Sequence, residues 1–152
     1  MLFTCDPYGP SSALTHPKQK VKKPKTLTVD IHCHLFNPKA AEMAAPHFDI
    51  SQEPFMKFAS ELTDEITKKQ NEERSKELTG VENRLKDMDE MMIDVQAIST
   101  APAQYYYWAD PDLGIELSQT VNDKIADIVA GHPDRFAGLG TVPVAVLQRT
   151  ML

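Results

Sequence analysis

Three short apolar runs, separated by segments with helical spacing, constrain the fold of this chain most strongly. The runs are residues 27–34, 95–100 and 136–142. In the first of them, Leu27, Val29 and Ile31 alternate with polar residues, which is the period of a β-strand. Because strands that alternate with helices usually form a parallel sheet with helical crossovers, the sequence predicts an α/β fold.

Two helices are predicted between these strands. Apolar residues recur on one face over about 81–92, and Thr79 and Glu82 have the spacing of a capping box in front of that helix. A longer helix is predicted to begin at Asp110, a cap residue followed by proline, and to end before Pro133. Each predicted helix lies between two predicted strands, as the crossovers of a parallel sheet do.

The predicted domain covers residues 25–143, with flanking segments of different character. Residues 1–24 carry four prolines and four lysines without apolar periodicity, which predicts a flexible amino-terminal arm. Residues 39–80 are interpreted as an insertion after the first strand, and their very polar part, 64–77, as a solvated helical face. Residues 144–152 form an atypical tail.

Composition excludes several classes of protein. The chain has 152 residues, 41% of them hydrophobic, and a net charge of -6 with a pI near 5.3, so the basic footprint of a nucleic-acid-binding protein is missing. The two cysteines are too few for a disulfide scaffold, which favours a reducing, cytoplasmic setting. We expect no membrane partner, because no window approaches the ~18 apolar residues of a spanning helix and no signal peptide is recognisable.

His32 and His34 stand at the end of the first predicted strand, and they are the candidate metal ligands. Residues i and i+2 of a strand point to the same face, so the two imidazoles and Asp30 are expected together, with Cys33 on the other face. Two imidazoles at a spacing of about 6.6 Å along the strand can converge on one ion. The alternative is an inert pair of hydrogen-bonded histidines, and the position at a strand end in an α/β pattern favours the metal.

Other residues carry weaker signals. Asp30 is interpreted either as a partner that orients a histidine or as a residue that caps a packing layer or pairs with a lysine. Trp108 follows the second strand and could line a pocket for a flat substrate, or pack on the insertion instead. We interpret Cys33 as a buried small hydrophobe, His47 as a surface residue and His132 as structural.

Several motifs in the same order resemble the amidohydrolase superfamily, in particular its branch of aminocarboxymuconate-semialdehyde, resorcylate and carboxyvanillate decarboxylases. The motifs comprise Val29-Asp30-Ile31-His32-Cys33-His34, Met88-Asp89-Glu90, the run from Ile93 to Thr100, Asn122-Asp123, and the run from Gly131 to Pro143. The resemblance therefore covers residues 27–143 and is specific for the family, though not for a substrate.

The resemblance implies the amino-terminal portion of a metal-dependent (β/α)₈ TIM barrel, truncated after about the third strand. It implies that His32 and His34 bind one divalent metal, zinc more readily than manganese, and that the remaining ligands and the catalytic base lie in a missing carboxyl-terminal part. A barrel of this kind needs ~250 residues, so the 152-residue chain is expected to be inactive alone. Relatives also often carry glycine where this chain has Met92, at a cost of ~1–2 kcal/mol if the backbone is left-handed.

The implied function is non-oxidative decarboxylation of a carboxylated aromatic or muconate-type substrate. Two alternatives stay open: metal-dependent hydrolysis of a lactone or an amide, and a non-catalytic fragment. The implied partner is a small-molecule carboxylate substrate, and the full-length protein is compatible with a homodimer. We expect neither nucleic acid nor a membrane as a partner.

Overall fold

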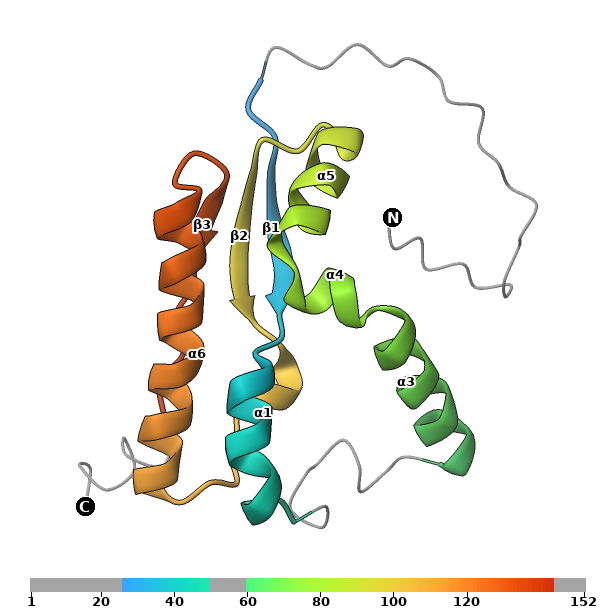
Figure 1. The fold of residues 1–152 in the computed structure, drawn as a ribbon, viewed down its shortest axis with the longest axis vertical. Coiled ribbons are helices and arrows are strands. Elements are labelled where there is room, and N and C mark those ends of the chain that lie inside the picture. The colour runs from blue at the N-terminus through green and yellow to red at the C-terminus, as the bar shows by residue number, and fades with distance from the viewer. Residues whose placement is uncertain (1–25, 50–59, 144–152) are drawn as a thin grey trace.

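The computed structural model describes residues 26–49 and 60–143 of the chain (Figure 1). Its strands are β1 (Val29–Leu35), β2 (Val95–Thr100) and β3 (Phe136–Gly138), and its α-helices are α1 (Pro38–Ala44), α3 (Glu61–Glu73), α4 (Ser75–Thr79), α5 (Val81–Met91) and α6 (Pro111–Gly131). The predicted arm, residues 1–24, and the tail, residues 144–152, lie outside the described residues.

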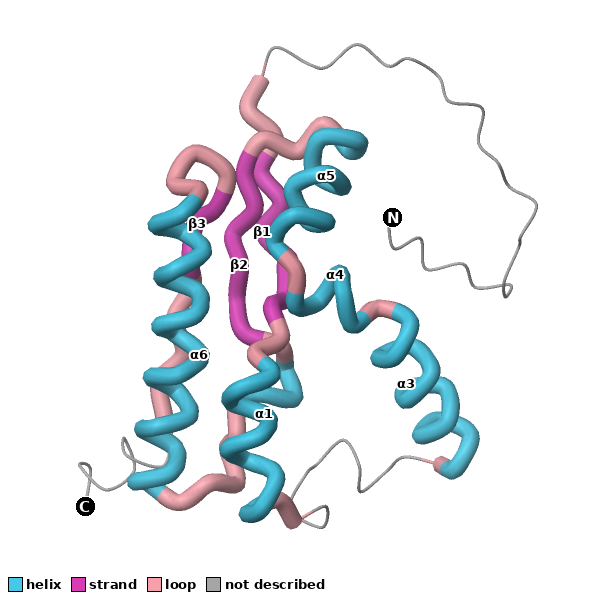
Figure 2. Tube along the Cα trace, in the orientation of Figure 1, coloured by secondary structure: helices cyan, strands magenta, loops and turns pink. Residues whose placement is uncertain are grey.

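The three strands form one parallel sheet in the order β1-β2-β3 (Figure 2). This arrangement confirms the predicted α/β class. Strand β3 ends at Gly138 rather than at residue 142. A side chain at Gly138 would meet the Cγ2 atom of Ile125 at 2.8 Å, so glycine is needed where β3 approaches α6 this closely.

Helices cover one face of the sheet, and the core lies between them and the strands. On β2, Gln96, Ile98 and Thr100 are buried, whereas the residues between them are only half-buried. The core joins side chains of β1, β2 and β3 to buried residues of the helices, namely Ala40, Ala44, Met88, Leu117, Val121, Ile125 and Ile128. The opposite face of the sheet is open, and Ile31 on it is 77% exposed.

The starts of α1 and α5 differ in how they are capped. The Asn37 side chain caps α1 by accepting from the N–H groups of Lys39 and Ala40. A cap residue followed by proline is typical of a helix start. The predicted capping box is wrong: Thr79 ends α4 and its hydroxyl donates to the Ser75 carbonyl at 2.6 Å, so Gly80 precedes α5 instead.

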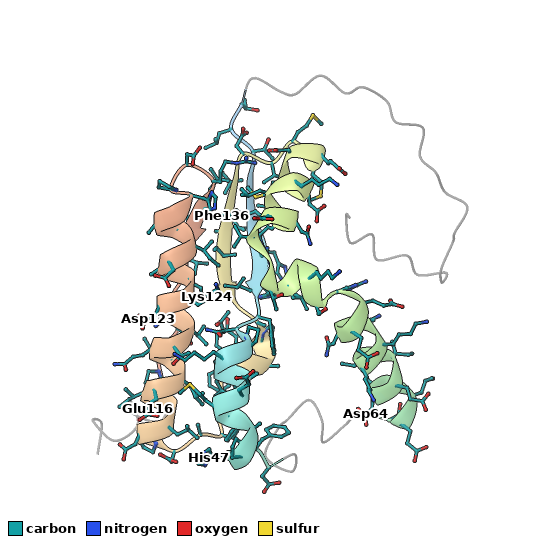
Figure 3. All side chains as sticks on the ribbon, viewed as in Figure 1. His47, Asp64, Glu116, Asp123, Lys124 and Phe136 are labelled. Carbon is teal, nitrogen blue, oxygen red and sulfur yellow. The ribbon has the colours of Figure 1, made fainter. Side chains whose placement is uncertain are left out.

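Within the insertion, α3 is a solvated helix. The described side chains of α3 are all exposed, with Asp64 near its start (Figure 3) and Lys69 paired with Glu73 at 3.9 Å. In the part of the chain that the structure describes, no helix has the length and apolar content needed to cross a bilayer.

Candidate metal centre

Strand β1 is bulged at the point where it presents the histidines. Asp30 pairs with Gln96 and Cys33 pairs with Ile98, so two residues of β1, Ile31 and His32, stand opposite a single residue of β2. A bulge of this kind interrupts the alternation of side chains. Asp30 therefore lies on the face of Cys33, and the expectation that it shares a face with the two histidines is wrong.

The two imidazoles of β1 point at each other. Their Nε2 atoms are 3.1 Å apart, and the rings meet edge to face with centroids 4.9 Å apart. The Nδ1 atom of His34 lies 3.1 Å from the Thr100 carbonyl oxygen and 3.2 Å from the Ser99 hydroxyl. Since a carbonyl oxygen can only accept, Nδ1 of His34 carries the proton of the neutral ring and its Nε2 holds a lone pair.

This geometry fits a divalent metal. Two metal–nitrogen bonds of ~2.0–2.1 Å can span the 3.1 Å between the Nε2 atoms. A metal-binding histidine usually donates its other ring N–H to a carbonyl or carboxylate, as His34 does to Thr100. Within residues 26–49 and 60–143, no group of three or more histidine, cysteine, aspartate or glutamate side chains gathers at one point.

A polar network lies behind the bulge, on the helix-covered face of the sheet. Gln96 donates to the Asp30 carboxylate at 3.3 Å and accepts from Arg84 at 3.2 Å, and Arg84 also donates to the main-chain carbonyl of His34 at 2.7 Å. Sequence analysis missed both residues. A glutamine at a position of β2 that should be apolar was the one available signal.

Asp30 and Cys33 on β1 have pKa values shifted in opposite directions. Burial, together with the neighbouring Asp30, raises the pKa of Cys33 to about 12, so its thiol stays protonated at neutral pH. Burial acts to raise the pKa of Asp30 too, but hydrogen bonds from Cys33, the His32 N–H and Gln96 outweigh it and leave that pKa below its usual value. The Asp30 carboxylate accepts from the backbone of His32 at 3.1 Å, not from an imidazole that it would orient. Cys33 is buried, as predicted.

Side-chain amides tie down the loops at the carboxyl end of the sheet. The Gln104 amide exchanges two hydrogen bonds of 2.7 Å with the backbone of Asn37, which joins the loops after β1 and β2. Asn122 on α6 likewise holds the backbone of Thr141 after β3, at 2.9 and 2.8 Å. Asn122 belongs to the Asn-Asp motif of the family resemblance, so this contact supplies a structural role for it.

Trp108 belongs to an aromatic cluster in this region. Its ring meets Phe48 at 5.6 Å and Tyr106 at 6.0 Å between centroids, and it is half-buried against the core. Its role as a substrate-lining residue stays a prediction. His47 is exposed at the far end of α1 (Figure 3), as predicted for a surface residue, and His132 packs edge-on against Phe136 at 6.0 Å, which agrees with a structural role.

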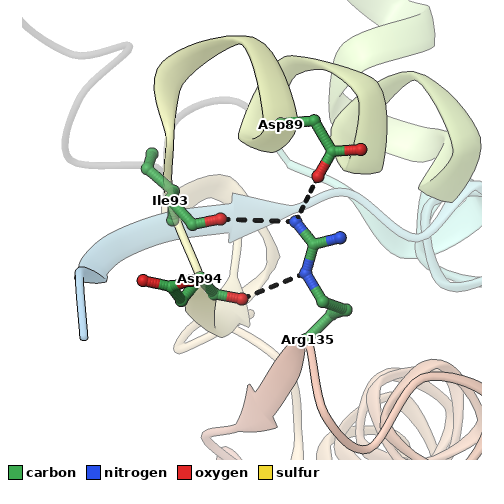
Figure 4. A network of polar contacts seen from close by, with 4 residues as sticks. All are labelled: Asp89, Ile93, Asp94 and Arg135. Atoms are coloured by element: carbon green, nitrogen blue, oxygen red, sulfur yellow. Dashed lines mark hydrogen bonds and ion pairs between the residues drawn. The ribbon is translucent and has the colours of Figure 1, made fainter. Parts of the chain in front are cut away.

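The amino end of the sheet has a different character. Arg135 donates to the carbonyls of Asp94 and Ile93 at 3.0 and 3.3 Å and pairs with Asp89 at 2.8 Å (Figure 4). A hollow of about 440 Å³ lies there, lined by Leu27, Asp89, Met92, Ile93, Asp94, Val95, Asp134 and Arg135. None of these lining residues is a histidine or a cysteine, so the hollow lacks the soft ligands of a zinc site.

Comparison with solved structures defines the class of fold. The chain superposes with TM-scores of 0.52 on a 2,6-dihydroxybenzoate decarboxylase, 0.54 on 5-carboxyvanillate decarboxylase from Sphingomonas paucimobilis and 0.55 on a manganese-bound dihydroxybenzoic acid decarboxylase from Polaromonas. Each superposition covers 78% of this chain, but only 32%, 35% and 31% of the respective structures, at 22% identity. The chain thus has the fold of about one third of these enzymes.

Sequence relatives narrow the resemblance. The chain is 35% identical over 68 residues to the 2-amino-3-carboxymuconate-6-semialdehyde decarboxylase of Dictyostelium discoideum, and 36% identical over 70 residues to that of Caenorhabditis elegans. These matches cover 45% and 46% of this chain but 19% and 18% of the relatives, so the chain spans about a fifth of their length. No family model matches the chain. The resemblance to this decarboxylase branch is confirmed, and the relatives are enzymes.

Proposed function

We propose that this chain forms the first part of a metal-dependent (β/α)₈ decarboxylase, and that His32 and His34 are two of its metal ligands. The observation that carries the proposal is the convergence of their Nε2 atoms at 3.1 Å, at the carboxyl end of a parallel sheet. In barrels, active sites form at that end of the strands. The names of the sequence relatives support a carboxylated muconate-type substrate, and the name of a similar solved structure supports a carboxylated aromatic one.

In this proposal, a different neighbouring group positions each of the two histidines. The Thr100 carbonyl holds the Nδ1 proton of His34 and keeps the lone pair of its Nε2 toward the site. The Asp30 carboxylate holds the backbone of His32 in the bulge. A bound divalent metal supplies positive charge that orients a carboxylate substrate and stabilises charge as the bond to CO₂ breaks.

Trp108 is proposed to help bind the substrate. It follows β2 at the same end of the sheet as the histidines, where the loops of a barrel face the site. Its ring offers a flat apolar surface for a conjugated or aromatic substrate.

The identity of the metal is left open between zinc and manganese. Imidazole ligands suit zinc, whereas carboxylate and water ligands suit manganese. Two of the similar solved decarboxylases were crystallised with manganese, which counts against our preference for zinc. The deciding ligands are those that the described residues do not supply.

Metal titration of the purified 152-residue chain, followed by NMR of the histidine rings, tests the proposal. Zinc is expected to shift the ring signals of His32 and His34, and manganese to broaden them, while His47 and His132 serve as internal controls in the same spectrum. Equal responses of the pair and of the two control rings, or no response at the pair, would contradict the proposed centre. Release of CO₂ from aminocarboxymuconate semialdehyde or carboxyvanillate is expected to be absent with this chain alone, because two imidazoles leave the coordination incomplete.

A further inference from the structure

We propose that Arg84 and Gln96 are positioning residues, which hold the bulge of β1 in the shape that brings His32 and His34 together. The inference rests on the proposed metal centre and adds the groups that set its geometry. Neither residue is offered as a ligand, because their hydrogen bonds run to the main chain of His34 and to the Asp30 carboxylate.

The network holds β1 on both sides of the bulge. Before the bulge, the Gln96 amide binds the carboxylate of Asp30 at 3.3 Å. After it, the Arg84 guanidinium binds the carbonyl of His34 at 2.7 Å. A 3.2 Å hydrogen bond between Arg84 and Gln96 joins the two anchor points. The network therefore holds the backbone of β1 between residues 30 and 34 from the helix-covered face of the sheet.

Burial makes these contacts matter. Gln96 is 5% exposed, and Arg84 on α5 is half-buried, so water cannot easily replace a lost partner. A bulge leaves one residue of the ladder unpaired and disrupts the ladder locally. A regular register would turn Asp30 toward the histidine face, since side chains alternate along an unbulged strand.

The planar guanidinium is specifically required. It donates from Nη1 to Gln96 and from Nη2 to His34, which is a two-pronged contact that the single ammonium of lysine does not reproduce. Arg84→Lys keeps the positive charge and most of the side-chain length but loses the two-pronged contact. This variant therefore distinguishes the effect of the guanidinium geometry from the effect of the charge.

Arg135 supplies a matched control, because it makes the same kind of contact at the other end of the sheet. It donates to two main-chain carbonyls, those of Ile93 and Asp94, and its side chain is 24% exposed. If Arg84 only stabilised the packing of a helix on the sheet, substitutions of Arg84 and Arg135 would have the same effect on the ring contact and zinc affinity of the histidines.

The experiment compares Arg84→Met, Arg84→Lys and Gln96→Met with Arg135→Met in the 152-residue chain. Two quantities are measured: the nuclear Overhauser effect between the rings of His32 and His34 without metal, and the zinc affinity of the pair from the NMR titration. We expect both Arg84 variants to lose the ring-to-ring contact and to bind zinc about tenfold more weakly or worse, as losses of groups behind metal ligands do. Arg135→Met is expected to change neither quantity.

Two results overturn the inference: folded Arg84 variants that keep both the ring contact and the zinc affinity, or equal losses in Arg84→Met and Arg135→Met. If Arg84→Met does not fold, Gln96→Met decides, because it breaks the link to Asp30 and leaves the contact of Arg84 with His34. An unchanged ring contact in Gln96→Met then counts against the proposal. Failure of the metal centre itself is distinguishable: the wild-type rings would be in contact and depend on Arg84, yet zinc would leave them unchanged.

Discussion

The amino and carboxyl ends of this small sheet both carry polar side chains, but the contacts of those side chains differ. At the amino end, a guanidinium binds carbonyl oxygens and a carboxylate, so charged and polar groups of the chain satisfy one another. At the carboxyl end, the Nε2 atoms of two imidazoles face each other across 3.1 Å, and the loops around them are held by amides. The contacts at the amino end stabilise the fold, whereas the carboxyl end presents nitrogen atoms that can bind a ligand.

Residues that stabilise the fold and residues proposed to bind metal therefore lie at opposite ends of the sheet. The contacts of Arg135 join the turn before β2 to the start of β3, and they would be broken if those segments separated. His32 is exposed and its ring contacts lie on the open face of the sheet, so the fold does not depend on it for packing. In barrels, the two ends of the strands divide the same two tasks.

Removal of both imidazoles is the change expected to have the largest effect on the carboxyl end. His32→Ala with His34→Ala should abolish the specific response of this site to zinc, because the pair comprises both proposed ligands. The thermal unfolding temperature should change little, since His32 is exposed and His34 only half-buried. Zinc titration and thermal unfolding of the same sample check this. A large loss of stability would show that the two ends are not separate in function.

Arg135→Met tests the amino end and should have the opposite signature. Loss of two charge-assisted hydrogen bonds to half-buried main-chain carbonyls is expected to cost about 1.5–3 kcal/mol of unfolding free energy, with the zinc response of the histidines unchanged. Urea unfolding monitored by circular dichroism measures the cost. An Arg135→Lys variant that recovers full stability would argue against the two-pronged contact as its cause.

The amount of this architecture that sequence predicts differs between the two ends as well. Periodicity located β1, β2, α5 and α6 to within a few residues, because their buried faces repeat at the strand or helix period. Convergence of His32 and His34 was predicted from their spacing of two. The short helix α1 was missed, since its seven residues carry little apolar periodicity and its cap resembles a turn.

The bulge of β1 could not be predicted from periodicity, because it is set by side chains distant in sequence. Arg84 and Gln96 lie more than 45 residues beyond the bulge and reach it only after α5 and β2 have packed. Asp30 was therefore assigned to the wrong face. Arg135 likewise gave no local signal, since its partners are the main-chain carbonyls of another segment.

Met92 allows the amino end to be strengthened without touching the carboxyl end. It has φ 59° and ψ 33°, the left-handed conformation that the resemblance to glycine-bearing relatives indicated. Such a conformation strains a side-chain-bearing residue by ~1–2 kcal/mol, part of which is offset by the greater freedom of unfolded glycine. Met92→Gly should therefore raise the unfolding free energy by about 1 kcal/mol. Met91→Gly, one residue earlier at the last residue of α5, is the control and should lower it, because glycine is unfavourable in a helix.

The ion pair between Arg135 and Asp89 should contribute least to the free energy of unfolding. Although the atoms are 2.8 Å apart, the Asp89 side chain is 69% exposed, so water and salt screen the attraction. Asp89→Asn is expected to cost about 0.2–1 kcal/mol, and less as the salt concentration rises. A double-mutant cycle with Arg135→Met separates this pair from the two carbonyl contacts: Asp89→Asn should have almost no effect once Arg135 is replaced. If Asp89→Asn costs as much in the Arg135→Met variant as in the wild type, Asp89 contributes to stability within α5 and not through the ion pair. The carbonyl contacts of Arg135 would then account for all of its stabilising effect at the amino end.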